Sequence, residues 1–150
     1  MNFVKIAHQA LRLVWRITKP VTQGARVIVV REGKILLVKH AYQNQYFLPG
    51  GRVKKGETFE QAARRELLEE VGIEATALKL FGVYNNFYEH KKDTIVVFLA
   101  EVLQSKRARD VEIESFGFFL LDQLPVNVSP GTRRRVEEYI NKTSANHGAW

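Results

Sequence analysis

The sequence contains no cysteine, so disulfide bonds, thiol catalysis and cysteine metal sites are all excluded. The absence of cysteine is compatible with a location in the cytoplasm, which is the location that we expect for this protein. Long apolar stretches are also missing: the longest, Ile95 to Ala100, is far below the roughly 20 residues that cross a bilayer. We therefore expect a soluble protein of one domain, with no membrane partner.

Acidic residues are absent before Glu32, although basic residues are not. Apolar side chains recur at helical spacing in this stretch, which predicts an amphipathic helix over residues 1–20. Such a helix can pack on its own domain, form the contact of a homodimer, lie on a membrane surface or act as a transit peptide. The pattern favours packing on the domain, with the dimer contact second. The spaced apolar residues are Phe3, Ala7, Ala10, Val14 and Ile17.

The chain has more basic than acidic residues overall, and its formal net charge is +7. The basic residues form short scattered clusters, whereas proteins that bind nucleic acids gather such charge on one face. We therefore do not expect a nucleic acid as the partner. Clusters such as Lys54 and Lys55 can instead steer a di- or triphosphate toward a metal ion.

Residues 51–73 contain glutamates at regular spacing. Glu66, Glu69 and Glu70 follow an i, i+3, i+4 pattern, so a helix would project all three side chains from one face. Like charges at this spacing destabilise a helix by about 0.2–0.5 kcal/mol per pair. A divalent cation with oxygen ligands is the simplest counter-charge, which makes this face a candidate metal site.

The segment that carries these glutamates has the signals of a helix. Thr58 and Gln61 have the spacing of a capping box, and Gly72 stands where a helix end favours a residue tolerant of positive φ. We expect one side of this helix to pack on a core and the acidic side to face a cleft. The apolar stripe consists of Ala63, Leu67 and Val71.

The segment GRVKKGETFEQAARRELLEEVGI resembles the Nudix box at every defining position. Gly51, Glu57 and the run from Arg65 to Ile73 stand at the spacing of that motif. The flanking chain is similar to the family over residues 22–140. The resemblance implies a loop, helix and second loop that hold Mg²⁺ or Mn²⁺.

By the same resemblance, the three helix glutamates are the main metal ligands and the Gly51 carbonyl is a further one. Glu57 is either a water-mediated ligand or the ion-pair partner of Arg65, which orients the helix. We therefore take Arg65, Glu66, Glu69 and Glu70 as the catalytic residues.

The chemistry of diphosphate hydrolysis agrees with these residue types. The reaction needs neutralisation of charge on the phosphoryl oxygens and an oriented water molecule, which carboxylate-held Mg²⁺ supplies. Because Mg²⁺ usually takes only one or two carboxylates, this array suggests more than one ion when substrate is present. One glutamate is then free to act as the general base. Glu112 or Glu114, from a later loop, is the alternative base.

We expect a metal-dependent hydrolase that cleaves a diphosphate linkage in a nucleoside diphosphate derivative: a nucleotide sugar, ADP-ribose or a nucleoside triphosphate. Two alternatives are a Nudix-fold nucleotide-binding or regulatory protein without hydrolysis, and an RNA 5′-end pyrophosphohydrolase. The intact glutamates favour hydrolysis. Candidate substrate contacts are basic and aromatic side chains near the box: Arg52, Lys54, Tyr46 and Tyr84.

The alternation of strands with a central and a late helix predicts an α/β/α sandwich around a mixed sheet, which the resemblance also implies. We expect a domain over residues 21–142 and a frayed tail over residues 143–150. The expected strands cover 26–30, 34–39, 46–48, 77–87, 94–102 and 116–121, and the closing helix covers 132–141.

Overall fold

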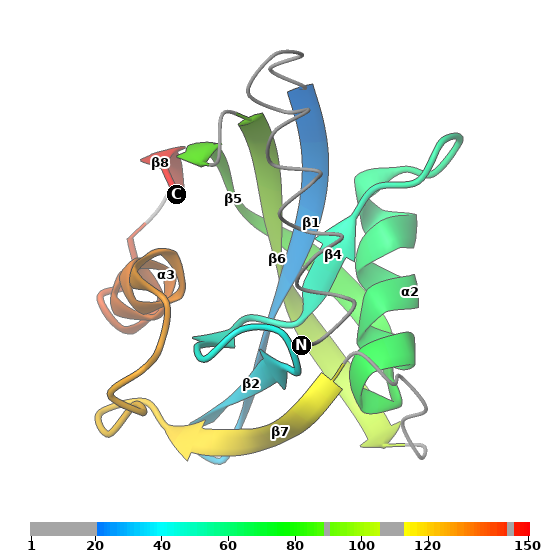
Figure 1. The fold of residues 1–150 in the computed structure, drawn as a ribbon. Coiled ribbons are helices and arrows are strands. Elements are labelled where there is room, and N and C mark those ends of the chain that lie inside the picture. The colour runs from blue at the N-terminus through cyan, green and yellow to red at the C-terminus, as the bar shows by residue number, and fades with distance from the viewer. Residues whose placement is uncertain (1–20, 89–90, 106–112, 144–145) are drawn as a thin grey trace.

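The computed structural model describes residues 21–88, 91–105, 113–143 and 146–150 (Figure 1). The helix predicted over residues 1–20 and the candidate base Glu112 lie outside these ranges, so both stay predictions. Neither helix of the described part is long and apolar enough to span a membrane. The elements are β1 (Val21–Arg31), β2 (Lys34–His40), β3 (Tyr46–Phe47), β4 (Gly50–Arg52), α2 (Phe59–Val71), β5 (Ile73–Tyr88), β6 (Lys91–Ser105), β7 (Ile113–Leu120), α3 (Pro130–Ile140) and β8 (Asn146–Ala149).

The eight described strands form one mixed sheet in the order β3-β2-β1-β6-β5-β8, with β4 paired to β1 and β7 paired to β2. Strands β1 and β6 are parallel, as are β5 and β8, and the remaining pairs are antiparallel. Strands β1 and β2 form a hairpin whose tight turn is at Glu32 and Gly33, and both residues have the positive φ that such a turn requires. Because β4 pairs with β1, Gly50 and Gly51 are fixed against the centre of the sheet.

The sheet is covered by α2 on one face and by α3 on the other (Figure 1). Leu67 and Val71 of α2 are fully buried against one apolar core, while Val136 of α3 is fully buried in a second core. The predicted α/β/α sandwich around a mixed sheet is therefore confirmed. Since alternate residues of a strand face opposite sides, each central strand contributes to both cores.

The chain after α3 differs from the sequence-based expectation. We predicted a frayed tail over residues 143–150, but Asn146–Ala149 form β8, which pairs in parallel with Gly82 to Asn85 of β5. The Trp150 ring then packs edge-on against Tyr84. The prediction was wrong because these contacts are made with residues far away in the sequence, which local composition does not show.

Candidate active site

Helix α2 forms as its sequence predicts. The capping box is present: the Thr58 hydroxyl accepts from the Gln61 amide at 3.1 Å, and Gln61 Oε1 accepts from the Thr58 amide at 2.8 Å. Gly72 ends the helix with a φ of 67°, a conformation that costs glycine little. The predicted stripe of Ala63, Leu67 and Val71 is fully buried. Burial of this stripe turns the Arg65–Glu66 side of the helix toward β4.

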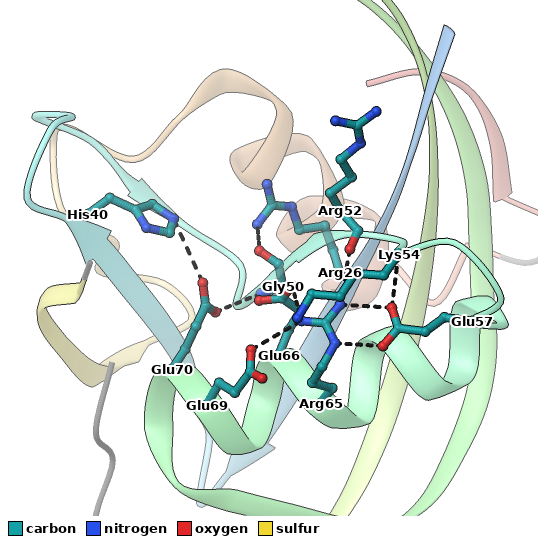
Figure 2. Close-up of polar contacts among 10 residues, drawn as sticks. All are labelled: Arg26, His40, Gly50, Arg52, Lys54, Glu57, Arg65, Glu66, Glu69 and Glu70. Carbon is teal, nitrogen blue, oxygen red and sulfur yellow. Dashed lines mark hydrogen bonds and ion pairs between the residues drawn. The ribbon is translucent and has the colours of Figure 1, made fainter. Parts of the chain in front are cut away.

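Arg65 is the centre of the acidic face (Figure 2). Its guanidinium binds both carboxylate oxygens of Glu57, with Nε 2.6 Å from Oε1 and Nη2 2.9 Å from Oε2. Nη1 lies 2.6 Å from Glu66 Oε1 and 3.1 Å from Glu69 Oε2, and Nη2 also donates to the Arg52 carbonyl. The expected ion pair between Arg65 and Glu57 is thus present, and one arginine holds three carboxylates.

These contacts shift the acid–base properties of both partners. The Arg65 hydrogen bonds, together with the bond from the Lys54 amide at 2.9 Å, lower the pKa of Glu57 from 4.5 to about 2. The bonds to Glu57 and then to Glu66 raise the pKa of Arg65 above its usual value. Both groups therefore stay charged throughout the neutral range, which keeps the pair intact.

Glu70 belongs to the same helix face but is held differently. It is 3% exposed, and its Oε2 accepts a hydrogen bond from the Gly50 amide at 2.8 Å. Its Oε1 lies 4.0 Å from Nε2 of His40, a buried residue at the end of β2 that stacks on Tyr42. Glu70 is thereby fixed between the glycine turn and β2, whereas Glu66 and Glu69 share Arg65.

The glycine turn, which we define as Leu48–Gly51, is held from several sides. Val27 of β1 donates its amide to the Pro49 carbonyl at 2.9 Å, and Arg26 donates to the Gly50 carbonyl. Gly51 lies directly against Glu66, since a Cβ at position 51 would be 2.5 Å from Glu66 Oε1. A side chain at position 51 would displace the Glu66 carboxylate from this place.

The donors gathered here are carboxylate oxygens beside a main-chain turn, the ligand set that hard divalent cations prefer. As the side chains stand, no three acidic or histidine residues of the described ranges converge on one ion position. The reason is visible in Figure 2, where Glu66 and Glu69 are turned toward Arg65. The cradle at Gly51 and the excess of carboxylates over cations fit a divalent ion, provided that these two side chains rotate.

Two predicted substrate contacts lie at the edge of this site. Arg52 follows the glycine turn, and its exposed side chain points away from the glutamates (Figure 2). Lys54 is exposed as well, and its amide is bonded to Glu57. Both stay candidates for contact with a substrate that extends beyond the metal site.

The other candidates lie elsewhere. Tyr46 is half-buried and packs edge-on against Phe119, with ring centroids 5.1 Å apart. Glu114, on β7, is exposed and pairs with Lys39 at 2.9 Å, so its role as the alternative base stays a prediction.

The prediction for Tyr84 was wrong. Its side chain is fully buried in the second core, which also contains Val136 of α3, and its hydroxyl donates to Glu138 at 2.7 Å. Burial, and then this hydrogen bond, raise the pKa of Tyr84 above its usual value. The side chain is therefore a core element with no surface to offer a ligand.

Three residues of the site were not found from the sequence: Arg26, His40 and Thr132. Arg26 and His40 belong to strands whose neighbours β4 and α2 come later in the chain. Thr132 accepts a hydrogen bond from the Leu48 amide across 84 positions. None of the three stands in a recognisable motif, and the only available signal was a polar residue at a strand end or helix start.

Comparison with known proteins agrees with this geometry. A family model described as the NUDIX domain matches residues 21–139. The chain is 35% identical over 122 residues to a Bacillus subtilis (strain 168) protein named "Putative 8-oxo-dGTP diphosphatase", and the match covers 80% of each chain. It is 32% identical over 103 residues to the ADP-ribose pyrophosphatase of Methanocaldococcus jannaschii, covering 65% of this chain and 61% of that protein.

Among solved structures, the MutT NUDIX hydrolase from Burkholderia pseudomallei is similar, with a TM-score of 0.71 and 31% identity. That match covers 78% of this chain and 96% of the other. The matched region contains the capped helix, the glycine turn and the Arg65 cluster described above. The chain therefore belongs to the Nudix family of pyrophosphohydrolases.

Proposed function

We propose that this chain is a Mg²⁺- or Mn²⁺-dependent enzyme that cleaves a diphosphate linkage in a nucleoside diphosphate derivative. The observation that carries the proposal is the imbalance of charge around Arg65, where one cation faces Glu57, Glu66 and Glu69 while Glu70 stands buried beside them. Such an excess of carboxylate beside a glycine turn needs a further cation. Nudix hydrolases generally use divalent metal ions.

The residues divide the work. Glu66, Glu69 and Glu70 would hold the ion, with the Gly51 carbonyl as a further ligand, while Arg65 remains on Glu57 and fixes the start of the helix. A bound divalent ion supplies charge neutralisation for the phosphoryl oxygens and activation of water. A carboxylate of this face takes the proton of the attacking water, which is general base catalysis. Two phosphate-bearing products result.

The surroundings of the site and the names of the relatives support a proposal for the substrate class. Arg52 and Lys54 are exposed cations beside the glycine turn, suited to the phosphates of a substrate. The two named relatives are a diphosphatase and a pyrophosphatase, whose names specify 8-oxo-dGTP and ADP-ribose. We therefore propose a nucleotide sugar, ADP-ribose or a nucleoside triphosphate. A nucleotide-binding protein without hydrolysis is the second candidate, and the complete glutamate set argues against it.

A hydrolysis screen tests this proposal. Nucleotide sugars, ADP-ribose, nucleoside triphosphates and 5′-triphosphorylated RNA are incubated with the protein and Mg²⁺ or Mn²⁺, with EDTA in parallel, and the phosphate-bearing products are measured. We expect turnover of at least one substrate that EDTA and Glu69→Gln abolish, while Glu60→Gln, a change in the exposed pair with Arg64, leaves it unchanged. Metal-dependent binding without turnover of any substrate would favour the second candidate.

A further inference from the structure

Helix α3 lies on the opposite face of the sheet from α2 (Figure 1). Its first turn is nevertheless hydrogen-bonded to the glycine turn. Thr132 is fully buried, and its Oγ1 accepts a hydrogen bond from the Leu48 amide at 3.3 Å. The same oxygen accepts from the hydroxyl of Ser129, the N-cap of α3, at 2.9 Å. Both lone pairs of the Thr132 hydroxyl thus have donors, one from the helix cap and one from the glycine turn.

The chain that leads into the glycine turn is joined to the chain that leads into α3. The Tyr46 amide donates to the Asn127 carbonyl at 3.0 Å, and the Ser129 amide donates back to the Tyr46 carbonyl at 3.0 Å. The Asn127 side chain donates to the Asn44 carbonyl at 2.9 Å. Thr132 adds the last bond of this series, at Leu48. The beginning of α3 and the beginning of the glycine turn therefore form one hydrogen-bonded unit.

The effect of Thr132 can be followed to a candidate metal ligand. Leu48 is separated by Pro49 from Gly50, whose amide binds Glu70 Oε2 at 2.8 Å. Proline fixes its own φ, so a displacement of Leu48 is passed on to Gly50 with little local relaxation. A buried amide without an acceptor is costly, so loss of the Thr132 oxygen would lead Leu48 to move toward another partner.

The far side of the same helical turn is braced by the end of the chain. A Cβ at Gly131 would clash with the indole of Trp150, so the ring packs directly on the main chain beside Thr132. Arg134 donates to the Trp150 carbonyl, and Arg135 donates to the Ala149 carbonyl at 3.1 Å. Strand β8 thus holds α3 in the place from which Thr132 reaches Leu48.

From these contacts we infer that Thr132 is a positioning residue. It fixes the position of the glycine turn relative to Glu70 and thereby the metal affinity of the glutamate face. This inference rests on the proposed metal-dependent hydrolysis. The hydroxyl of Thr132 has no part in the chemistry itself, since it is fully buried and bonded to Leu48 and Ser129.

The test compares one substitution that removes the hydrogen-bond acceptor with one that keeps it. Thr132→Val keeps the shape of the side chain but removes the acceptor, while Thr132→Ser keeps the acceptor and removes a methyl group. Mn²⁺ binding is measured by electron paramagnetic resonance without substrate. We expect Thr132→Val to weaken binding about tenfold, the lower end of the range for loss of an outer-shell partner, and Thr132→Ser to bind within about twofold of the wild type.

Tyr84→Phe is the matched control, because it removes a hydrogen bond to Glu138 in the last turn of α3 without touching the glycine turn. It should lower the melting temperature and leave Mn²⁺ affinity unchanged. Equal Mn²⁺ affinity in wild type and Thr132→Val, or equal losses in the Val and Ser variants, would overturn the inference. If the wild-type protein itself binds no Mn²⁺, the proposed function fails instead, so the two failures are distinguishable.

Discussion

The two helical layers of the sandwich each contain an arginine that binds glutamate, and the surroundings of the two arginines differ. Arg65, on α2, faces the carboxylates of Glu57, Glu66 and Glu69 and has a side chain that is 18% exposed. Arg135, on α3, is buried and, among the described residues, pairs with the carboxylate of Glu138 alone. Its guanidinium lies 3.7 Å from the centre of the Tyr84 ring.

This contrast separates a site from a structural element. The carboxylates around Arg65 exceed its charge and remain partly open to solvent, so they can accept a metal ion. Around Arg135 the charges balance: the guanidinium packs on two aromatic rings and donates to a main-chain carbonyl, and its buried Nε has no hydrogen-bond partner among the described residues. The local ratio of acidic to basic groups, rather than the presence of an ion pair, distinguishes the two regions.

The largest effect should come from neutralising one glutamate in each region. Glu70→Gln keeps an acceptor for the Gly50 amide but removes a charge that offsets the metal ion, so kcat/KM should fall at least about a hundredfold with the fold intact. Glu138→Gln should leave kcat/KM within twofold and lower stability by about 2 kcal/mol, because it removes the charge that pairs with Arg135. Steady-state kinetics and thermal melts measure both. Normal Mg²⁺-dependent turnover by Glu70→Gln would refute the assignment of the site.

Lysine at each arginine position should give the next largest difference. A lysine cannot bind a carboxylate through two nitrogens, so Arg65→Lys should reduce metal affinity or rate about tenfold or more, with a small change in melting temperature. Arg135→Lys loses the stacking on Tyr84 and should cost about 2 kcal/mol of stability, with kcat/KM unchanged. If the two variants behave alike in both assays, the distinction between the regions is wrong.

Much of the α2 region could be predicted from the sequence, because its information is local. The cap residues, the apolar stripe, the acidic face and the Glu57–Arg65 pair lie within 23 positions, and helical geometry alone brings most of them together. The order of strands and helices likewise determined the sandwich. What the sequence did not show is that Glu70 is held separately, since its partners Gly50 and His40 come from β4 and β2.

The α3 region was predicted poorly because its contacts are long-range. Tyr84 was taken for a surface aromatic, but it pairs with Glu138, which is 54 positions away. Residues 146–150 have no pattern typical of a strand, and they are ordered through pairing with β5 and through the arginines of α3. A residue whose environment is assembled from distant segments leaves no periodic signal in its own neighbourhood.

The two regions should also respond to opposite ends of the pH scale. The pKa of Glu57 is about 2 in the folded protein and 4.5 ordinarily, so its contribution is complete above pH 4.5 and is lost as the pH falls toward 2. The pKa of Tyr84 is raised above its ordinary value of 10, so its contribution is complete below pH 10 and is lost as the pH rises beyond 10.

Denaturant unfolding with EDTA present would measure the loss of stability at low pH and at high pH separately. The stability difference between wild type and Glu57→Gln should shrink from pH 4.5 downward, and that between wild type and Tyr84→Phe should shrink above pH 10. Each variant serves as the control for the other end of the pH scale. A difference that stays constant with pH would show that the mutated group does not titrate as its contacts imply.

The smallest effect is expected beside Arg65 itself. Arg64 forms an exposed pair with Glu60 one turn earlier, with Nη2 2.9 Å from Oε1 and the two side chains 39% and 52% exposed. Solvent screens such a pair, and it contains only one carboxylate. Glu60→Gln should therefore lower the free energy of unfolding by only about 0.5 kcal/mol, or the melting temperature by roughly 1–2 °C. Metal affinity and kcat/KM should stay within twofold.

Glu57→Gln, one turn away, removes the charge that Arg65 binds through two nitrogens, and should lower both metal affinity and kcat/KM more than fivefold. A comparable loss in Glu60→Gln would mean that the ratio of carboxylates to arginine does not define the site.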